Sequence, residues 1–581
     1  MSEGERVDEG GEPSARAWST ACLVSACCLV LLAALSGVHG FDGEFLYDDV
    51  SYITDNPQVQ QGDPWSLFRE PMARMKQLGL FRPLTFLTYW MQSSGRGREE
   101  SPVPYHVFNV VVHCLVSLVL FAYLVEVLPV GVAALAAALF AVHPMHSEAV
   151  IWIVGRAELL CALLCIASLW ALRRTGLPFT LLGSLLWLGA CLCKETALVL
   201  PGLQLLLDQM RRRQWTTRAL GTRYACFALL ILVLFLWRRA VLGHFGPVKS
   251  LGPYGDESLL ERLAIAARLL LRYVRVMLLP HPSRAFYHHS EFLHWQALDW
   301  VALAAALGLI AVHRRLAPLA AGFCIFLLPV LNVWPIQETF AERFLYLPSA
   351  FFCPLLSATL MLPVHRELSR RGRLGVSLVV PACAVLLFWV LSMHHNRQFH
   401  SALELWRNTL IHARAFPFPH YQIAFYMQAS KIYTASPEDP ELKGAIREFE
   451  EALRLNDEWL EKGERGMPPD QIARAHLNLG IMKGELAREQ KFTIPEVESH
   501  FRKSLLVAAS HPLLDLERIQ ASLSLARLRD PALGSRVTTS EAITLLEQAL
   551  STARSRSELG SFAANLEEEL SAVKREIDGR Q

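Results

Sequence analysis

Long apolar segments recur through the first 393 residues of this 581-residue chain, and they restrict its fold more than any other feature. A helix of about 20 apolar residues spans the hydrocarbon core of a bilayer. The segments predicted to cross a membrane are 18–39, 107–126, 130–143, 157–172, 177–193, 195–209, 221–243, 299–312, 316–335, 345–362 and 375–393. Because 52% of all residues are hydrophobic and only 19% are charged, the composition also favours an all-α polytopic membrane protein of about eleven spans with some soluble mass.

Basic clusters between these segments predict their orientation, because short loops rich in Lys and Arg stay on the cytoplasmic side. The clusters are Arg173 with Arg174, 211–213 with Arg218, 313–315 and 365–373. Residues 259–282 carry Arg262, Arg268, Arg272 and Arg275 at helical spacing, so we expect an amphipathic segment in the outer interface. With an odd number of crossings, the polar and disordered residues 1–17 are predicted to lie in the cytoplasm. Residues 394–581 are then predicted to lie on the outer or luminal side.

The cysteines and the net charge argue against several classes of function. All twelve cysteines lie between Cys22 and Cys383, mostly inside apolar runs, so they are interpreted as small apolar residues rather than a disulfide framework or a metal site. The net charge of +2 and the lack of a dense basic block argue against a nucleic-acid partner.

After residue 394 charged residues become denser and the pattern changes to that of soluble helices. Four segments place a large apolar residue four positions after a small or β-branched one, and a small residue three positions later. They are Ala402/Trp406/Thr409, Ala445/Phe449/Ala452, Val497/Phe501/Ser504 and Ala542/Leu546/Ala549. In "KGAIREFEEALRLN" this is the second-helix pattern of a tetratricopeptide repeat, and Gly480 occupies the close-approach position of a first helix. We expect a degenerate array of helical hairpins whose concave surface binds an extended peptide or a protein.

Polar residues of the first half gather in segments predicted to lie on the outer side. They are Asp48 and Asp49 in the loop 40–106, Arg82 in "FRPLTFLTYW", His146, Glu148, Arg156 and Glu158 in "HPMHSEAVIWIVGRAELL", Lys194 and Glu195 in "CKETALVLP", and Glu342, Arg343 and Tyr346 in "QETFAERFLYLPS". Charges at a membrane boundary tend to face a protein cavity, although Lys and Arg at span ends also reach toward headgroups. Adjacent acids repel each other and do not reach out in this way, so a functional role is expected for Asp48 or Asp49. His143, His146 and Glu148 lack the HExxH spacing, and a hydrogen-bonding role is expected for them instead of zinc binding.

Six motifs in this order resemble the transmembrane and tetratricopeptide-repeat (TMTC) family. They are "YDDVSYITDNPQV", "RPLTFLTYW", "YHVFNVVVH", "HPMHSEAVIWIVGRAELL", "CKETALVLP" and "AERFLYLPS", and helical repeats follow them. The resemblance covers the chain from about residue 40 to its C-terminal end.

The resemblance implies a glycosyltransferase of the GT-C type that moves mannose from a polyprenyl-phosphate donor to Ser or Thr hydroxyls of protein acceptors. It implies that the key acid of the first outer loop is Asp48 or Asp49. Such an acid suits general-base catalysis, and cations suit the phosphate leaving group. The candidates for binding that phosphate are Arg82, Arg156, Lys194 and Arg343, with His146 and Glu148 orienting them. A divalent cation between acid and phosphate is left open.

Two other functions compete with this interpretation. A non-catalytic, membrane-anchored repeat scaffold that binds luminal or extracytoplasmic proteins explains the repeats, but it does not explain six polar motifs on one side. A transporter needs charges near the middle of the bilayer, whereas the charges here lie at span ends. The expected location is the endoplasmic reticulum membrane in a eukaryote or the plasma membrane in a bacterium.

Overall fold

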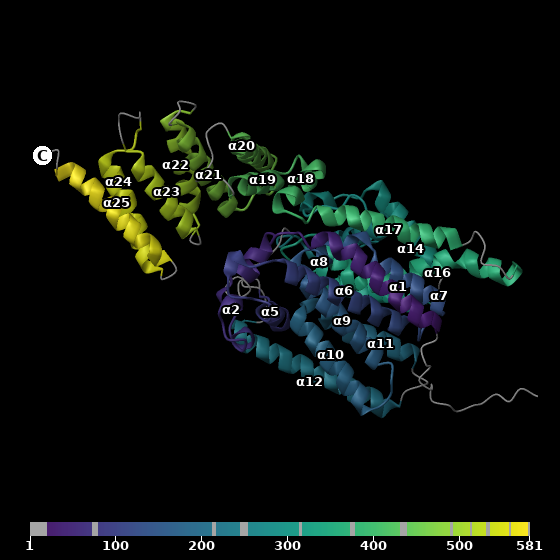
Figure 1. Ribbon diagram of the computed structural model, residues 1–581. Coiled ribbons are helices and arrows are strands. Elements are labelled where there is room, and N and C mark those ends of the chain that lie inside the picture. The colour runs from purple at the N-terminus through teal and green to yellow at the C-terminus, as the bar shows by residue number, and fades with distance from the viewer. Residues whose placement is uncertain are drawn as a thin grey trace, which may run out of the picture. The chain divides into compact units, whose positions relative to one another are not determined.

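The structure is a computed structural model that describes residues 20–71, 79–211, 216–244, 254–312, 316–371, 378–429, 439–487, 492–511, 514–529, 535–556 and 559–578. Residues 1–17, predicted to be disordered, and the basic positions 212–213, 313–315 and 372–373 lie outside this part. The chain divides into two compact units (Figure 1), which we call the membrane unit (1–402) and the repeat unit (403–581). Throughout the described ranges the regular structure is helical, which confirms the all-α class.

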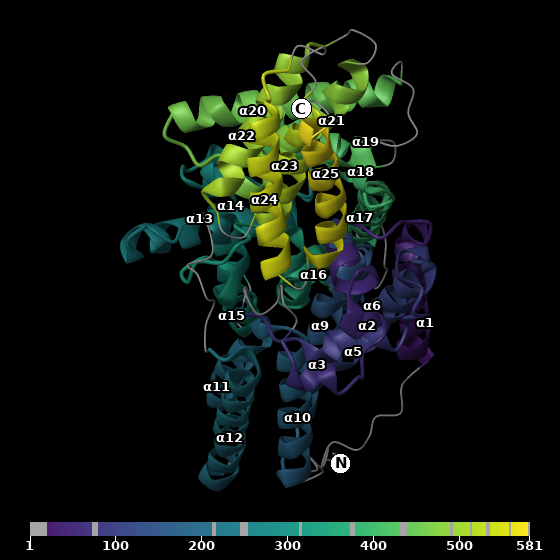
Figure 2. The ribbon, with the colours of Figure 1, turned by 90° about the vertical axis from the view of Figure 1, so that its left-hand side faces the viewer.

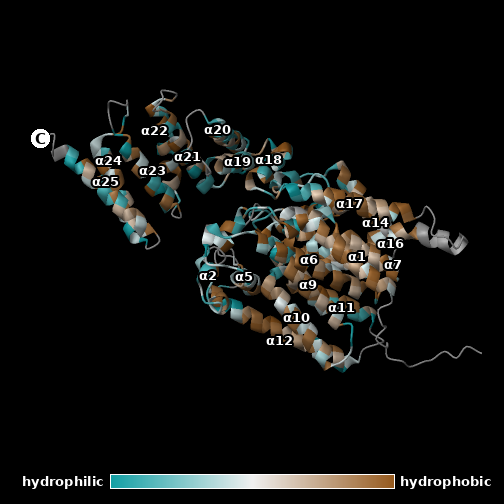
Figure 3. Ribbon diagram, viewed as in Figure 1, coloured by the Kyte–Doolittle hydropathy of each residue, from teal (hydrophilic) through white to brown (hydrophobic). Residues whose placement is uncertain are grey.

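Each of the eleven apolar segments forms a helix in the membrane unit. The helices are α1 (Thr20–Gly37), α6 (Val103–Leu124), α7 (Val130–Ala141), α9 (Arg156–Ala171), α10 (Leu177–Cys193), α11 (Leu200–Met210), α12 (Thr217–Leu242), α14 (Ala297–Val312), α15 (Ala317–Leu327), α16 (Tyr346–Arg371) and α17 (Val379–Arg397). Six helical stretches in the described residues are long and apolar enough to span a bilayer, or seven if α7 and the bent stretch Pro144–Val150 count as one. Figure 3 shows that hydrophobic residues predominate in the helices of this bundle. The other helices are shorter, so eleven crossings stay a prediction.

The segment predicted to be amphipathic forms helix α13 (Leu259–Leu278). The helix begins with a capping box, in which the Ser258 side chain accepts from the Glu261 backbone N–H and the Glu261 carboxylate accepts from the Ser258 backbone N–H. Figure 2 shows α13 lying across the direction of α10 and α12. This orientation distinguishes α13 from the bundle helices.

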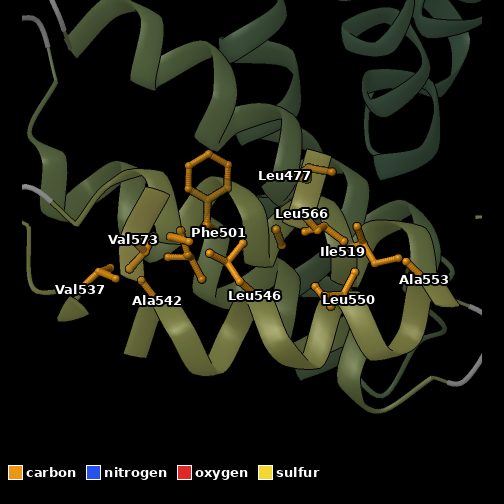
Figure 4. Packing of buried hydrophobic residues seen from close by; sticks show 14 of the residues in the cluster. Leu477, Phe501, Ile519, Val537, Ala542, Leu546, Leu550, Ala553, Leu566 and Val573 are labelled. Atoms are coloured by element: carbon orange, nitrogen blue, oxygen red, sulfur yellow. The ribbon is translucent and has the colours of Figure 1, made fainter. Parts of the chain in front are cut away.

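The repeat unit is a row of helical hairpins. The pairs are α19 (Pro417–Ala429) with α20 (Pro440–Glu461), α21 (Pro469–Ala487) with α22 (Ile494–Ala509), and α23 (Asp515–Arg527) with α24 (Thr539–Ser555), followed by α25 (Gly560–Asp578). All twelve residues of the predicted small/large/small pattern are buried, including the three on α18 (Ala402–Ala413). Figure 4 shows the core between the last hairpins, where Phe501, Ile519, Leu546 and Leu566 converge.

Gly480 on α21 lies against the ring of Phe501 on α22. A Cβ added at Gly480 would lie 2.6 Å from Cε1 of Phe501, whereas one added at Gly560 would meet nothing within 4 Å. We therefore expect Gly480→Leu to destabilise the α21–α22 pair by about 1–3 kcal/mol, because the overpacked helices must separate. Hydrogen exchange of these two helices in the full chain measures the effect, and Gly560→Leu is the matched control. Equal protection in both variants would contradict the close packing.

His420 on α19 links two helices of the repeat unit through Glu448 on α20. The His420 Nδ1 lies 2.6 Å from the Glu448 carboxylate, and its Nε2 donates to the Arg414 carbonyl over 3.0 Å. Burial lowers the pKa of His420, but the hydrogen bonds to Glu448 and to the Arg414 carbonyl, together with the charges of Glu448 and Glu451, outweigh burial and hold the pKa above its usual value. This stabilisation is complete below the unfolded pKa of about 6.5 and is lost as the pH rises through the folded pKa.

The α19–α20 pair should therefore lose stability between neutral and alkaline pH, by at most about 1 kcal/mol because the pair is partly exposed. Hydrogen exchange of these helices in the full chain, corrected for the intrinsic pH dependence of exchange, measures the loss. Glu448→Gln should remove the pH dependence. If Glu448→Gln kept the pH dependence, a group other than His420 would be responsible for it.

Candidate active site

The two aspartates of the loop 40–106 lie within an unusual stretch of backbone. Tyr47 has φ +38°, in the left-handed region that side chains other than glycine rarely adopt. Val50–Thr54 forms one turn of π-helix directly after Asp49. Both conformations cost free energy and are frequent at functional sites. Asp48 and Asp49 lie between these two features.

Asp49 is fully buried and joins two distant segments of the chain. Its Oδ2 accepts from the Leu46 backbone N–H over 2.8 Å, and its Oδ1 accepts from the Val154 backbone N–H over 2.9 Å. Burial raises the pKa of Asp49 well above its usual value, although both backbone hydrogen bonds act in the opposite direction. Because both oxygens bind backbone, Asp49 positions the first loop against the segment that precedes α9.

Asp48 is half-buried. Its charge interacts with the guanidinium of Arg343 and with the carboxylate of Glu338. The Glu338 side chain is 56% exposed and lies 3.9 Å from Arg343. Asp48 therefore belongs to a charged cluster that is partly open to solvent, whereas Asp49 does not.

Arg343 and Glu148 form the centre of this cluster. One oxygen of Glu148 accepts from the Arg343 backbone N–H over 2.8 Å, and the other forms an ion pair with the guanidinium. The guanidinium also lies over the Trp152 ring, 5.4 Å from its centroid. The double attachment to Glu148 fixes Arg343, whose side chain is 19% exposed.

Two further ion pairs adjoin this centre. Arg82 binds Glu195 through Nε at 3.0 Å and Nη2 at 2.9 Å, while Lys194 pairs with the buried Glu158. Burial lowers the pKa of Arg82, but the Glu195 carboxylate outweighs burial and raises the pKa above its usual value. The charge of Arg343 acts on both Arg82 and Lys194. Three cations therefore lie in one electrostatic neighbourhood, and each already has a carboxylate partner.

Arg156 lies apart from the cluster, in the packed interior, and is fully buried. Its Nε donates to Asn109 Oδ1 over 2.8 Å, its Nη1 donates to Thr88 Oγ1 over 3.2 Å, and its Nη2 donates to the Tyr105 carbonyl over 3.1 Å. The Tyr89 ring covers the guanidinium at 4.6 Å. These contacts join α9 to α6 and to α5 (Pro83–Trp90).

His146 and Tyr346 also lie in the interior. The His146 Nε2 lies 2.8 Å from the Ser349 hydroxyl, and the Tyr346 hydroxyl lies 2.7 Å from the Nδ1 of His113 on α6. The rings of His146 and Tyr346 pack at 4.7 Å. These contacts hold the start of α16 against α6, so both residues support the backbone that carries Arg343.

Glu342 holds the segment that follows α13. Its carboxylate accepts from the Ser283 hydroxyl at 2.6 Å, the Arg284 backbone N–H at 3.1 Å and the Tyr287 hydroxyl at 2.5 Å. Glu342 therefore faces a different segment from its neighbour Arg343.

Sequence reasoning did not select Asn109 or Ser283, which hold Arg156 and Glu342. Asn109 offered a signal, because it is a polar amide inside the apolar segment 107–126. Nothing in the sequence around Ser283 marks it as a partner of Glu342.

A small, mainly apolar pocket of about 20 Å³ lies beside Glu195. Its lining comes from Phe81, Cys191, Glu195, Leu198, Leu234, Phe235 and Arg238.

Within the described ranges, no group of three or more His, Cys, Asp and Glu side chains is arranged to hold a metal ion. The polar cluster thus combines a half-buried acid, three cations and an adjoining apolar pocket.

Three curated relatives show what the chain is similar to. It is 36% identical over 231 residues to protein O-mannosyl-transferase TMTC1 of Mus musculus, covering 35% of this chain and 24% of the relative. It is 26% identical over 408 residues to TMTC4 of Mus musculus, and this alignment covers 56% of this chain and 54% of the relative. It is 25% identical over 421 residues to TMTC3 of Mus musculus, and this alignment covers 63% of this chain and 45% of the relative. The aligned regions thus span between about a quarter and about half of these relatives' lengths.

No protein-family model and no solved structure matches the chain. The similarity to several relatives and the ordered polar motifs lead to the same family. The chain is thus similar, over part of their length, to protein O-mannosyl-transferases of the transmembrane and tetratricopeptide-repeat (TMTC) family.

Proposed function

We propose that this protein transfers a sugar, mannose, from a polyprenyl-phosphate donor to Ser or Thr hydroxyls of protein acceptors. The names of its relatives, protein O-mannosyl-transferases, support transfer of mannose to proteins. One structural observation carries the assignment of the base. Asp48 is half-buried and its charge interacts with that of Arg343, whereas both oxygens of Asp49 are bound to backbone amides.

Asp48 acts as the general base in this proposal. Its carboxylate takes the proton of the acceptor hydroxyl while the hydroxyl oxygen forms a bond to the anomeric carbon of the sugar. The bond between that carbon and the phosphate oxygen breaks, and its electron pair leaves with the lipid phosphate. Because a single displacement occurs, the configuration at the anomeric carbon inverts.

Cations of the cluster stabilise the phosphate as it gains charge. The side chains of Arg343 and Arg82 are 19% and 20% exposed, so a phosphate can reach them, whereas that of Lys194 is only 6% exposed. Arg156 is enclosed and serves the fold.

The repeat unit takes the acceptor protein in this proposal. Stacked helical hairpins present an extended surface, which suits an acceptor segment without folded structure. The ordered cluster of polar residues favours an enzyme over a scaffold, because protein binding alone does not require it.

The test is transfer by the purified full chain in nanodiscs. Polyprenyl-phosphate mannose and Ser- or Thr-containing peptides are supplied, and mass spectrometry measures hexose addition. We expect a hexose on the hydroxyl residues, with the anomeric configuration of the product opposite to that of the donor by NMR. Peptide binding without transfer, for both dolichyl and undecaprenyl donors, would support the scaffold function instead.

A further inference from the structure

Helix α13 is firmly attached along its C-terminal half. The Nε of Arg272 lies 3.2 Å from the Asp299 carboxylate at the start of α14, and both side chains are buried. Arg275 donates to the Gln296 side chain over 2.8 Å. The Tyr273 ring stacks on Phe340 with centroids 4.3 Å apart. This half of α13 is therefore fixed against the first turn of α14 and the segment before α16.

Two tryptophans mark the junction of α13 and α14. The rings of Trp295 and Trp300 stack with centroids 5.1 Å apart, and the residues are 42% and 55% exposed. The guanidinium of Arg268 on α13 lies over Trp295, 5.7 Å from its centroid. Exposed tryptophans at the end of an apolar helix are typical of the membrane–water interface. The junction is thus suited to lie at headgroup level, and α13 lies there with it.

The N-terminal half of α13 presents an apolar stripe. Leu259, Leu260 and Leu263 are 56%, 79% and 46% exposed, and Ala264 and Ala267 extend the stripe along the helix. Arg262 and Arg268 flank it. An apolar stripe bordered by arginines matches the boundary between acyl chains and phosphates of a lipid leaflet.

We propose that the N-terminal half of α13 docks into the outer leaflet of the membrane. Leu259, Leu260 and Leu263 enter the acyl boundary, and Arg262 and Arg268 bind lipid phosphates. None of these residues belongs to the charged cluster around Arg343, and the proposal does not depend on the proposed activity. Phospholipid is the occupant that accounts for the leucines, the arginines and the neighbouring tryptophans together.

The experiment measures the depth of a label in the full chain. Exposed Cys27, Cys28 and Cys383 are replaced by Ala, and an environment-sensitive fluorophore is attached through Leu260→Cys in phosphatidylcholine nanodiscs. Lipids that carry a quencher high on the acyl chain should quench this label at least about twofold more than a label at Gln61→Cys, in the exposed first outer loop. A soluble quencher should give the opposite order.

A second label and a charge variant complete the test. Leu263→Cys should report the same depth as Leu260→Cys, which guards against a local defect at one site. Arg262→Gln should move the label at position 260 toward water, and an unchanged depth would overturn the phosphate contact. Labels at 260 and 263 that match the Gln61 label would overturn docking. Labels shielded from both quenchers would overturn it too, in favour of a protein partner.

Discussion

Asp48→Asn should reduce sugar transfer by about 10²–10⁴-fold, because an amide cannot accept the hydroxyl proton. The substitution keeps the size of a half-buried side chain, so the thermal unfolding midpoint should change little. Transfer to peptide in nanodiscs measures the first effect, and thermal unfolding of the same samples measures the second. Full transfer by Asp48→Asn would exclude this residue as the base.

Asp49→Asn is the matched control, and it should act mainly on stability. Its amide nitrogen would face one of the two backbone N–H groups, from Leu46 or Val154, that the carboxylate now accepts. Because two hydrogen-bond donors would then face each other in the interior, the free energy of unfolding should fall by about 1–3 kcal/mol. The variant should therefore unfold at a lower temperature and retain transfer in proportion to its folded fraction. If Asp49→Asn lost transfer but kept its stability, Asp49 would be the base and Asp48 the structural residue.

Arg343→Gln should lower kcat/KM for the lipid donor by about 10²–10³-fold, because the departing phosphate loses a charged donor. The variant also leaves Glu148 buried without its cation, so a loss of stability accompanies it. Arg343→Lys separates the two effects. It keeps the charge beside Glu148 but not the planar pair of donors, so it should restore stability and only part of the transfer.

Arg156→Gln provides the contrast, because Arg156 is enclosed by Asn109, Thr88 and the Tyr105 carbonyl. It should lower the unfolding temperature and leave the KM for the donor in the folded fraction unchanged. A raised donor KM in Arg156→Gln, with a normal KM in Arg343→Gln, would reverse the assignment of the phosphate contact.

The sequence predicted the gathering of charges better than the role of each charge. Charged residues at the ends of apolar segments must avoid hydrocarbon, which is why Arg82, Glu148, Lys194 and Arg343 could be expected to share one site. The same argument selected Arg156, yet this residue turns inward to Asn109. Which carbonyls and amides a side chain meets depends on packing between distant helices, and one sequence does not contain that information.

Asp48 and Asp49 show the limit most clearly. Both are acids at the same boundary, and nothing in the pattern ranks one above the other. The left-handed φ of Tyr47 and the π-helical turn after Asp49 accompany their different directions. The fold was more predictable, because each of the eleven apolar segments forms a helix. Segment 195–209 differs in detail, since it divides into a short 3₁₀ turn, Glu195–Val199, and the 11-residue helix α11.

Glu342 and Arg343 are consecutive residues with different attachments. Glu342 accepts hydrogen bonds from residues 283–287, which follow α13, while Arg343 forms an ion pair with Glu148. A displacement of α13 would thus be transmitted through a single peptide bond to the cation beside Asp48. If the protein transfers sugar as proposed, its turnover is expected to vary with bilayer thickness and lateral pressure even when donor and acceptor are saturating.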